Sequence, residues 1–272
     1  MKKKLYIFIF LYLLHIPQAL CWNSVGHRLI AQIAYDQLTR KAKTTFNRCN
    51  REANHDYMSK NFVNSSVWLD TIRARTHAYD AMHYIDIPFS TDGTRLPGVS
   101  TVNAVWAVDK AKKTLSNPKS TATAKRLALR ILVHVVGDIH QPLHAATRIS
   151  REYPEGDRGG NLVVLHKNRM GKNLHSYWDK GAGLLVGKRR YGHVWIKQKA
   201  MRIEHYWPCN MRQMDLNPMH WAQESNVLAI QTAYAYSPDI HYQLEAQQLV
   251  EKRIALAGCR LASTLMALEA VD

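Results

Sequence analysis

The segment from Ile131 to His144 constrains this chain most, because it places metal-binding types of side chain within an otherwise apolar stretch. His134 and Asp138 are four residues apart, so on a helix they project from the same face. Pro142 should end or kink that helix and allow His144 to turn toward the same point. A carboxylate buried without a partner is costly, and a cation removes that cost. The segment therefore predicts a metal site; the alternative is a set of core histidines, each satisfied by one hydrogen bond.

The first 21 residues have the pattern of a secretory signal peptide. Three lysines precede an apolar run at Leu5–Leu14, and Ala19-Leu20-Cys21 follows as the cleavage pattern. We expect cleavage after Cys21, which would make Trp22 the first residue of a domain spanning residues 22–272 and would send the protein to a periplasm or out of the cell. A membrane anchor and a lipidated Cys21 are the alternatives, but the apolar run is short for a bilayer.

The chain is strongly basic and poor in cysteine. Its 272 residues carry a formal charge of +16, and loss of the three N-terminal lysines would leave +13. A basic surface attracts polyanions, either nucleic acid or an anionic membrane. Beyond Cys21, the cysteines Cys49, Cys209 and Cys259 permit one disulfide in any of three pairings. Their wide spacing argues against a cysteine-type zinc ribbon.

The apolar spacing predicts an all-α, single-domain helical bundle with a small β-hairpin. Helical patterns cover residues 26–38, 65–73, 101–116, 121–141 and 243–268. Residues 81–88 have an extended pattern before a proline. Residues 161–165 are the one run typical of a strand, and the turn at 167–172 suggests that this run forms the hairpin. We find no internal repeat and no linker that would divide the chain.

Further nitrogen and oxygen ligands lie outside the first segment. His175 and Asp179 repeat the spacing of four residues, Asp70 precedes His83, and His27 begins a helical pattern shortly after Trp22. Asp70 taken alone could equally form a surface ion pair. Together these groups exceed what one ion needs, because zinc takes about four ligands and a carboxylate can bridge two ions. Several neighbouring zinc ions are therefore expected.

The spacing of these residues resembles that of a known family, the trinuclear-zinc nucleases of the S1/P1 type, which are secreted and specific for single strands. Zinc phospholipase C is a more distant relative, and the fold implied is the helical phospholipase C/nuclease type. The resemblance covers residues 22–179. The motifs that carry it are Trp22-x4-His27, Trp68-Leu-Asp70-x2-Arg73, His83-Tyr-Ile-Asp86, His134-x3-Asp138-x-His140-Gln-Pro-Leu-His144, Gly159-Gly-Asn161 and Asn173-Leu-His175-x2-Trp178-Asp179.

The resemblance implies three zinc ions per chain. The first would be held by Asp70, His83, His134 and Asp138, and the second by His144, His175 and Asp179. The third would be held by the α-amine and carbonyl oxygen of Trp22, by His27, and by Asp138 as the bridge. A free α-amine exists at Trp22 only after cleavage before it, so secretion would complete the site.

The resemblance also implies the chemistry, which is metal-assisted hydrolysis of phosphodiester bonds in single-stranded DNA and RNA and of 3′-nucleotides, leaving 5′-phosphates. Asp70 and Arg73 would be catalytic, Asp70 by orienting or deprotonating water and Arg73 by gripping the phosphate. Tyr84 and Asp86 would hold a base by stacking and hydrogen bonding, which favours single strands. The alternative for this pair is a core tyrosine beside a salt-bridged aspartate.

Side chains behind the ligands should fix the imidazole tautomers by accepting their second N–H. His140, Gln141 and Asn161 are the nearby candidates, and Asn161 is also expected to bind substrate. His140 faces another side of the helix from His134 and Asp138, so we do not assign it as a ligand.

Two other functions compete with the nuclease. A zinc phospholipase C would use the same metals on lipid phosphodiesters, although Asp179 stands where that branch usually has Glu and Arg73 suits a nucleotide phosphate. A cationic binding protein with structural zinc is the other, although structural zinc sites usually include cysteine. The sequence leaves open the base preference, the balance of endo- and exonucleolytic cleavage, the oligomeric state and glycosylation at the sequon of Asn64.

Overall fold

The computed structural model describes residues 22–51, 61–186, 192–210 and 214–270. The predicted signal peptide lies outside the described residues, and Trp22 is the first residue within them. The fold is helical, as predicted. The α-helices are α1 (Ser24–Gln37), α2 (Arg40–Arg51), α3 (Phe62–Ser65), α4 (Trp68–Ile72), α5 (Ala104–Ser116), α6 (Ala122–Ile139), α7 (Leu174–Asp179), α8 (His193–Tyr206), α9 (Pro218–Leu228) and α10 (Ile240–Glu269); the short turns are η1 (Asp80–His83), η2 (Pro142–Ala145), η3 (Gly181–Gly183) and the π-helical η5 (Ala229–Ala233).

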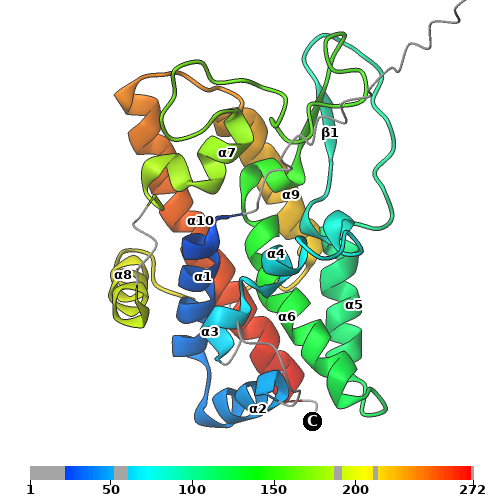
Figure 1. Cartoon of the computed structure of the whole chain (residues 1–272), viewed down its shortest axis with the longest axis vertical. Coiled ribbons are helices and arrows are strands. Elements are labelled where there is room, and N and C mark those ends of the chain that lie inside the picture. The colour runs from blue at the N-terminus through cyan, green and yellow to red at the C-terminus, as the bar shows by residue number, and fades with distance from the viewer. Residues whose placement is uncertain (1–21, 52–60, 187–191, 211–213, 271–272) are drawn as a thin grey trace, which may run out of the picture.

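Helix α6 is the centre of the molecule. Thr121 caps it by accepting from the Ala124 amide at 3.2 Å, and residues 128–139 are buried on every side. A helix that is apolar all round must be covered all round. In Figure 1, α5 lies on one side of α6, and α1 and the long helix α10 lie on the other. The His134 and Asp138 side chains on this helix are therefore enclosed in the core, where they have no access to bulk water.

The small β element lies at a different place from the predicted hairpin. Strands β1 (Pro88–Ser90) and β2 (Thr147–Ile149) pair in parallel, and each follows a histidine-bearing turn, η1 or η2. The run at 161–165 forms one isolated antiparallel bridge, between Val164 and Asn173. The Leu165 amide donates to the Lys172 carbonyl at 3.0 Å and the Leu174 amide to the Val163 carbonyl at 2.9 Å, so the run turns back as predicted but pairs over too few residues to form a strand.

The predicted helix at 65–73 is interrupted at Ser66. The Ser66 hydroxyl donates to the Val63 carbonyl at 2.7 Å, and the Ser66 carbonyl accepts from the His134 ring at 2.6 Å, so the chain begins a second helix, α4, at Trp68. This break has a function in the site, because it directs a backbone oxygen at His134.

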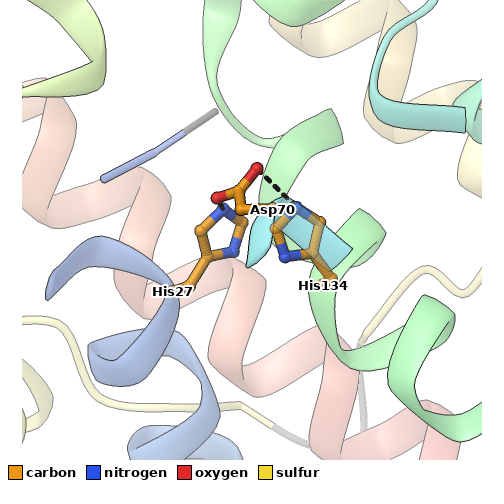
Figure 2. Close-up of side chains that lie close together, drawn as sticks. All are labelled: His27, Asp70 and His134. Carbon is orange, nitrogen blue, oxygen red and sulfur yellow. Dashed lines mark ion pairs between the residues drawn. The ribbon is translucent and has the colours of Figure 1, made fainter. Parts of the chain in front are cut away.

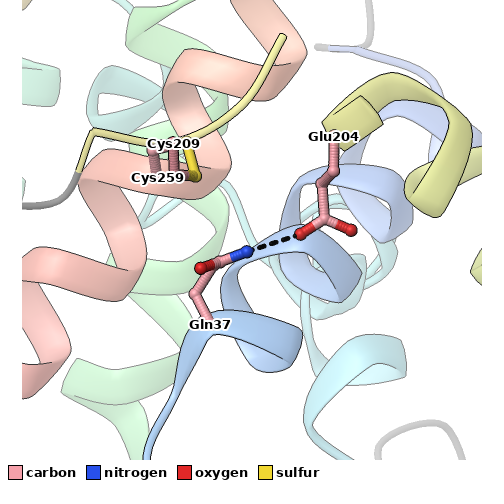
Figure 3. Close-up of a disulfide and its surroundings, with 4 residues drawn as sticks. All are labelled: Gln37, Glu204, Cys209 and Cys259. Atoms are coloured by element: carbon pink, nitrogen blue, oxygen red, sulfur yellow. Dashed lines mark hydrogen bonds between the residues drawn. A yellow bond between two sulfur atoms is a disulfide. The ribbon is translucent and has the colours of Figure 1, made fainter. Parts of the chain in front are cut away.

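A disulfide joins Cys209 to Cys259 and ties the segment after α8 to α10 (Figure 3). This settles the pairing that the sequence left open and places Cys49, in α2, outside the bond. Near it, the Gln37 amide donates to Glu204 at 2.8 Å, so α1 and α8 are also linked. Among the helices that the structure describes, none combines the length and apolar character needed to cross a membrane.

Candidate metal centre

Asp138 lies at the meeting point of three imidazoles that come from different elements. Its Oδ1 is 3.3 Å from His27 Nε2, and its Oδ2 is 3.1 Å from His83 Nδ1 and 3.2 Å from His134 Nε2. Asp70 approaches the same group from α4, with Oδ1 3.7 Å from His134 Nε2 (Figure 2). The structure therefore brings together five of the predicted ligands, separated by up to 111 residues, around one carboxylate.

Local packing fixes the two stacked rings of this group. His134 donates its Nδ1–H to the Ser66 carbonyl at 2.6 Å, which leaves the lone pair on Nε2, and its ring stacks on His27 with centroids 3.9 Å apart. Gly137 makes room for His27, because a Cβ there would lie 3.1 Å from His27 Nδ1. The indole of Trp22 donates to the Gly137 carbonyl at 3.0 Å. The start of the described chain is thus anchored beside this group.

A second group contains His144, His175 and Asp179. The His144 Nδ1 donates to the His83 carbonyl and the His175 Nδ1 to the Gly159 carbonyl, each at 2.7 Å. The two Nε2 atoms then face each other at 3.1 Å, with Asp179 oxygens 3.7 and 3.5 Å away from them. The Ile85 amide donates to the His144 carbonyl at 2.8 Å, so a backbone hydrogen bond fixes the position of the second group relative to the first.

These contacts fit divalent cations. With both Nδ1–H groups used, the facing Nε2 atoms of His144 and His175 need either a proton shared between them as a hydrogen bond or a metal ion that both can bind. In the first group, both His27 ring nitrogens, Asp70 Oδ1 and Asp138 Oδ1 are buried without a hydrogen-bond partner among the described residues. Buried polar atoms normally have partners, so these are suited to a metal. Imidazole nitrogens and carboxylate oxygens are donors that bind several divalent metal ions.

Three sets of described side chains place their ligand atoms within 4.8 Å of one another, and they could hold three ions. The sets are His27 with Asp70 and His134, His83 with His134 and Asp138, and His144 with His175 and Asp179. The first two share His134. Since its Nδ1 is held by Ser66, only Nε2 is free to bind, so His134 can serve one ion.

The electrostatics favour a charged Asp138. Burial opposes its ionisation, but the neighbouring His134 charge and the hydrogen bonds of the histidines hold the pKa of Asp138 well below its usual value. Burial also opposes protonation of His134, yet the carboxylates of Asp138 and Asp70 raise the pKa of His134 to about 9. Burial lowers the pKa of His27 and His83. The negative carboxylates thus attract positive charge into this group.

The predicted substrate residues Arg73, Tyr84 and Asp86 each lie within three residues of a predicted ligand, Asp70 or His83, along the chain. Arg73 Nε donates to Asp80 at 3.1 Å, and the Tyr84 side chain is 40% exposed, which excludes the alternative of a core tyrosine. Burial and the charge of Asp157 raise the pKa of Asp86 to about 6, against the opposing effect of His144 and Arg158.

The acceptors that orient the imidazoles are backbone carbonyls rather than the predicted side chains. Asn161 donates its own amide to the Arg158 carbonyl at 2.7 Å. His140 contacts the Val136 carbonyl at 2.7 Å and Arg260 at 3.1 Å. Gln141 is the one candidate that reaches a predicted ligand, and it donates to Asp179 at 2.8 Å. The acceptor role suggested for His140 and Asn161 is therefore wrong, whereas His140 lies in the core and away from the ligands, as expected, and the substrate-binding role of Asn161 stays a prediction.

Sequence reasoning missed two acidic residues behind the site. Asp80 holds Arg73, and Asp157 is fully buried, accepting from the Arg148 and Gly160 amides and from the Tyr234 hydroxyl at 2.8–3.1 Å. The Gly-Asp-Arg-Gly-Gly run at 156–160 was the available signal, since a carboxylate among glycines often organises a loop.

Comparison with known proteins agrees with this geometry. The model of the S1/P1 Nuclease family matches residues 22–269. Endonuclease 4 of Arabidopsis thaliana is 26% identical over 91% of this chain and 89% of its own length. Nuclease S1 of Aspergillus oryzae is 25% identical over 90% of each chain, and Nuclease P1 of Penicillium citrinum is 24% identical over 89% of this chain and 96% of its own. With a family match across nearly the whole described chain and clustered ligands at the expected motifs, the chain belongs to the S1/P1 nuclease family and is a phosphodiester-hydrolysing enzyme.

Proposed function

We propose that the protein is a secreted, zinc-dependent nuclease that hydrolyses single-stranded DNA and RNA and 3′-nucleotides and leaves 5′-phosphates. The observation that carries this proposal is the convergence of His27, His83 and His134 on Asp138 at 3.1–3.3 Å. An exposed tyrosine, Tyr84, and a fixed arginine, Arg73, lie close along the chain to these ligands. A metal group that is merely structural would not require such substrate-type side chains.

The ligand sets proposed are those of the family. Asp70, His83, His134 and Asp138 would hold one zinc, and His144, His175 and Asp179 a second. His27, the shared Asp138 and the terminal amine and carbonyl of Trp22 would hold the third. When bound, these ions would lower the pKa of an attacking water and neutralise charge on the phosphate.

The position of Trp22 supports a processed N-terminus as a ligand. Its side chain is fully buried and bonded to Gly137, one residue before Asp138, and the next amide, of Asn23, donates to the Asp179 carbonyl at 3.0 Å. The chain at this point therefore runs between the two groups. The Cys209–Cys259 disulfide agrees with export, because disulfides persist in oxidising compartments.

The residues beside the metals would divide the remaining tasks. Asp70 would orient the attacking water and take its proton, since its Oδ1 is buried without a hydrogen-bond partner among the described residues. Arg73 would grip the phosphate, held in place by Asp80. Tyr84 would stack on an unpaired base while Asp86 hydrogen-bonds its edge, which requires a single strand.

The experiment uses the processed protein, with its N-terminal residue determined and its zinc content measured. Single-stranded RNA, double-stranded RNA, a 3′-nucleotide and phosphatidylcholine micelles are assayed in parallel, before and after EDTA and after zinc is restored. We expect cleavage of the single strand and the 3′-nucleotide, lost with EDTA and recovered with zinc. Lipid turnover without nucleic-acid cleavage would establish a phospholipase C instead, and activity unchanged by EDTA would overturn the metal assignment.

A matched variant tests the terminal amine. One alanine added before Trp22 leaves every side chain in place but moves the α-amine away. We expect it to bind one zinc fewer per chain. Full zinc content in this variant would contradict the role proposed for Trp22.

A further inference from the structure

The loop at 156–160 is held rigidly against the second metal group. Asp157 is fully buried and accepts hydrogen bonds from the Arg148 and Gly160 amides at 3.0 and 3.1 Å. The Gly159 carbonyl accepts from His175 at 2.7 Å, and a Cβ on Gly159 would lie 2.3 Å from the Leu143 carbonyl oxygen. Asp157 and Gly159, the residues on either side of Arg158, are therefore held in place. This fixes the direction in which the Arg158 side chain extends from the loop.

Arg158 itself has a backbone conformation that its side chain disfavours. Its φ is +56°, and the other residues of positive φ in this loop, Gly156, Gly159 and Gly160, are all glycines. A left-handed conformation suits glycine and is strained for a residue with a Cβ. The Arg158 side chain is exposed, so burial gives no reason for its presence. Strained positions of this kind gather at functional sites.

The loop that carries Arg158 packs against the strand pair that follows the proposed base site. The Asp157 amide donates to the Arg148 carbonyl in β2 at 3.0 Å, and the Thr147 amide of the same strand donates to the Ile87 carbonyl, one residue after Asp86, at 3.1 Å. The Arg158 carbonyl also accepts from the Asn161 amide at 2.7 Å. Arg158 therefore lies on a loop that contacts both the second metal group, through Gly159, and the strand beside Asp86, whereas Arg73 is the arginine assigned to the phosphate that is cleaved.

We propose that Arg158 is a substrate-binding residue that contacts a neighbouring phosphate of the polynucleotide, next to the nucleotide held by Tyr84 and Asp86. This inference rests on the proposed function. A guanidinium can bind two phosphate oxygens at once, which makes it suited to a backbone phosphate. A 3′-nucleotide has only the phosphate that is cleaved, so Arg158 should matter more for an oligonucleotide than for a mononucleotide.

The chain offers a matched pair of variants, Arg158→Gly and Lys167→Gly. Lys167 also has a φ of +56° and an exposed cationic side chain, but it lies in the turn after residues 161–165. Both changes remove one positive charge and relieve one strained backbone position. Thermal unfolding should show that neither variant is less stable than the wild type. A loss of activity in Arg158→Gly then cannot come from misfolding.

Kinetics on a single-stranded oligonucleotide and a 3′-nucleotide give the decisive comparison. For Arg158→Gly we expect KM for the oligonucleotide to rise by about 10-fold, with a change several times smaller for the mononucleotide. The slope of log kcat/KM against log salt should become shallower by about 0.7, the value for one phosphate contact on a single strand. Lys167→Gly should behave as the wild type.

Equal effects on both substrates, or an oligonucleotide KM unchanged in Arg158→Gly, would overturn the assignment of Arg158. The proposed function would survive either result, because it is tested by the wild type alone. A wild type that cleaves no single strand would instead remove the proposed function.

Discussion

His134 in α6 and His140 at its C-terminal cap are both fully buried, yet they face opposite charges. His134 Nε2 lies 3.2 Å from Asp138, and its pKa is raised to about 9 because Asp138 and Asp70 outweigh burial. His140 Nε2 lies 3.1 Å from Arg260, and burial, with the charges of Arg253 and Arg260, holds its pKa well below the usual value. Burial alone therefore does not show which histidine is suited to bind a metal ion. The sign of the neighbouring charge distinguishes the two, because carboxylates face His134 and arginines face His140.

The arginine side of this comparison secures the end of α6. Arg253 donates to the His140 carbonyl at 3.1 Å and to the Ser225 hydroxyl at 2.7 Å, and Ser225 donates to the Ile139 carbonyl. Arg260 binds both Glu224 oxygens at 2.6 and 2.7 Å. These bonds satisfy helix-end carbonyls that would otherwise lack partners. We infer that this side contributes stability, whereas the carboxylate side binds metal.

The largest effect should come from Asp138→Asn, which removes the carboxylate proposed to be shared by two ions. We expect hydrolysis to fall by on the order of 10³-fold, beyond the 10–100-fold typical of residues behind the ligands. Zinc content should fall by up to two ions per chain. His140→Asn is the control, because it changes an equally buried residue on the arginine side and should keep all the zinc. Normal zinc content in Asp138→Asn would contradict the inference that the carboxylate side binds metal.

A smaller effect, on stability, should follow Arg260→Met. The change leaves Glu224 with a single, longer contact to Arg253 and removes a donor near His140, which should cost about 3 kcal/mol. Urea denaturation measures it, and zinc content should not change. Lys41→Met breaks an ion pair with Glu269 in α10 in which the Lys41 side chain is 75% exposed, and should cost less than about 1 kcal/mol. Loss of zinc in Arg260→Met would show that the arginines near His140 also affect metal binding by the carboxylates near His134.

The smallest effect concerns pH and compares two carboxyl groups. The pKa of Asp138 is held low, whereas that of Asp86 is raised from 3.8 to about 6, by burial and then by Asp157. Between pH 4 and 6 the folded protein therefore binds more protons at Asp86 than the unfolded chain does. The contribution of Asp86 to the free energy of unfolding is greatest below pH 4, declines through this window and is constant above it.

Urea denaturation of the chelated wild type and of Asp86→Asn, from pH 4 to 7, measures this contribution. The wild type should lose about 1–2 kcal/mol relative to the variant as pH rises, less than the full shift implies because Asp86 is partly exposed. No change over the same range would show that Asp86 ionises as easily in the fold as in the unfolded chain, and a gain in stability would show that it ionises more easily in the fold.

The sequence by itself determined the helical class, the family and the ligand pairs that lie within one element. Spacing of four residues in His134 and Asp138, and in His175 and Asp179, is enough, because a helix brings such side chains onto one face whatever surrounds it. The motifs supplied Asp70, His83 and His27 through resemblance. Physical reasoning on the segments alone would not have placed these residues beside Asp138.

Only the tertiary structure decided which groups hold these side chains in place. The carbonyls that orient His134 and His144 belong to Ser66 and His83, which are 68 and 61 residues away in the chain. Three other features could likewise be known only from the tertiary structure. They are the parallel pairing of β1 with β2, the hydrogen bond from Arg73 to Asp80, and the disulfide of Cys209 with Cys259. Every residue carries a backbone carbonyl, so its use as an acceptor leaves no mark in composition or periodicity and is fixed only when distant segments pack together.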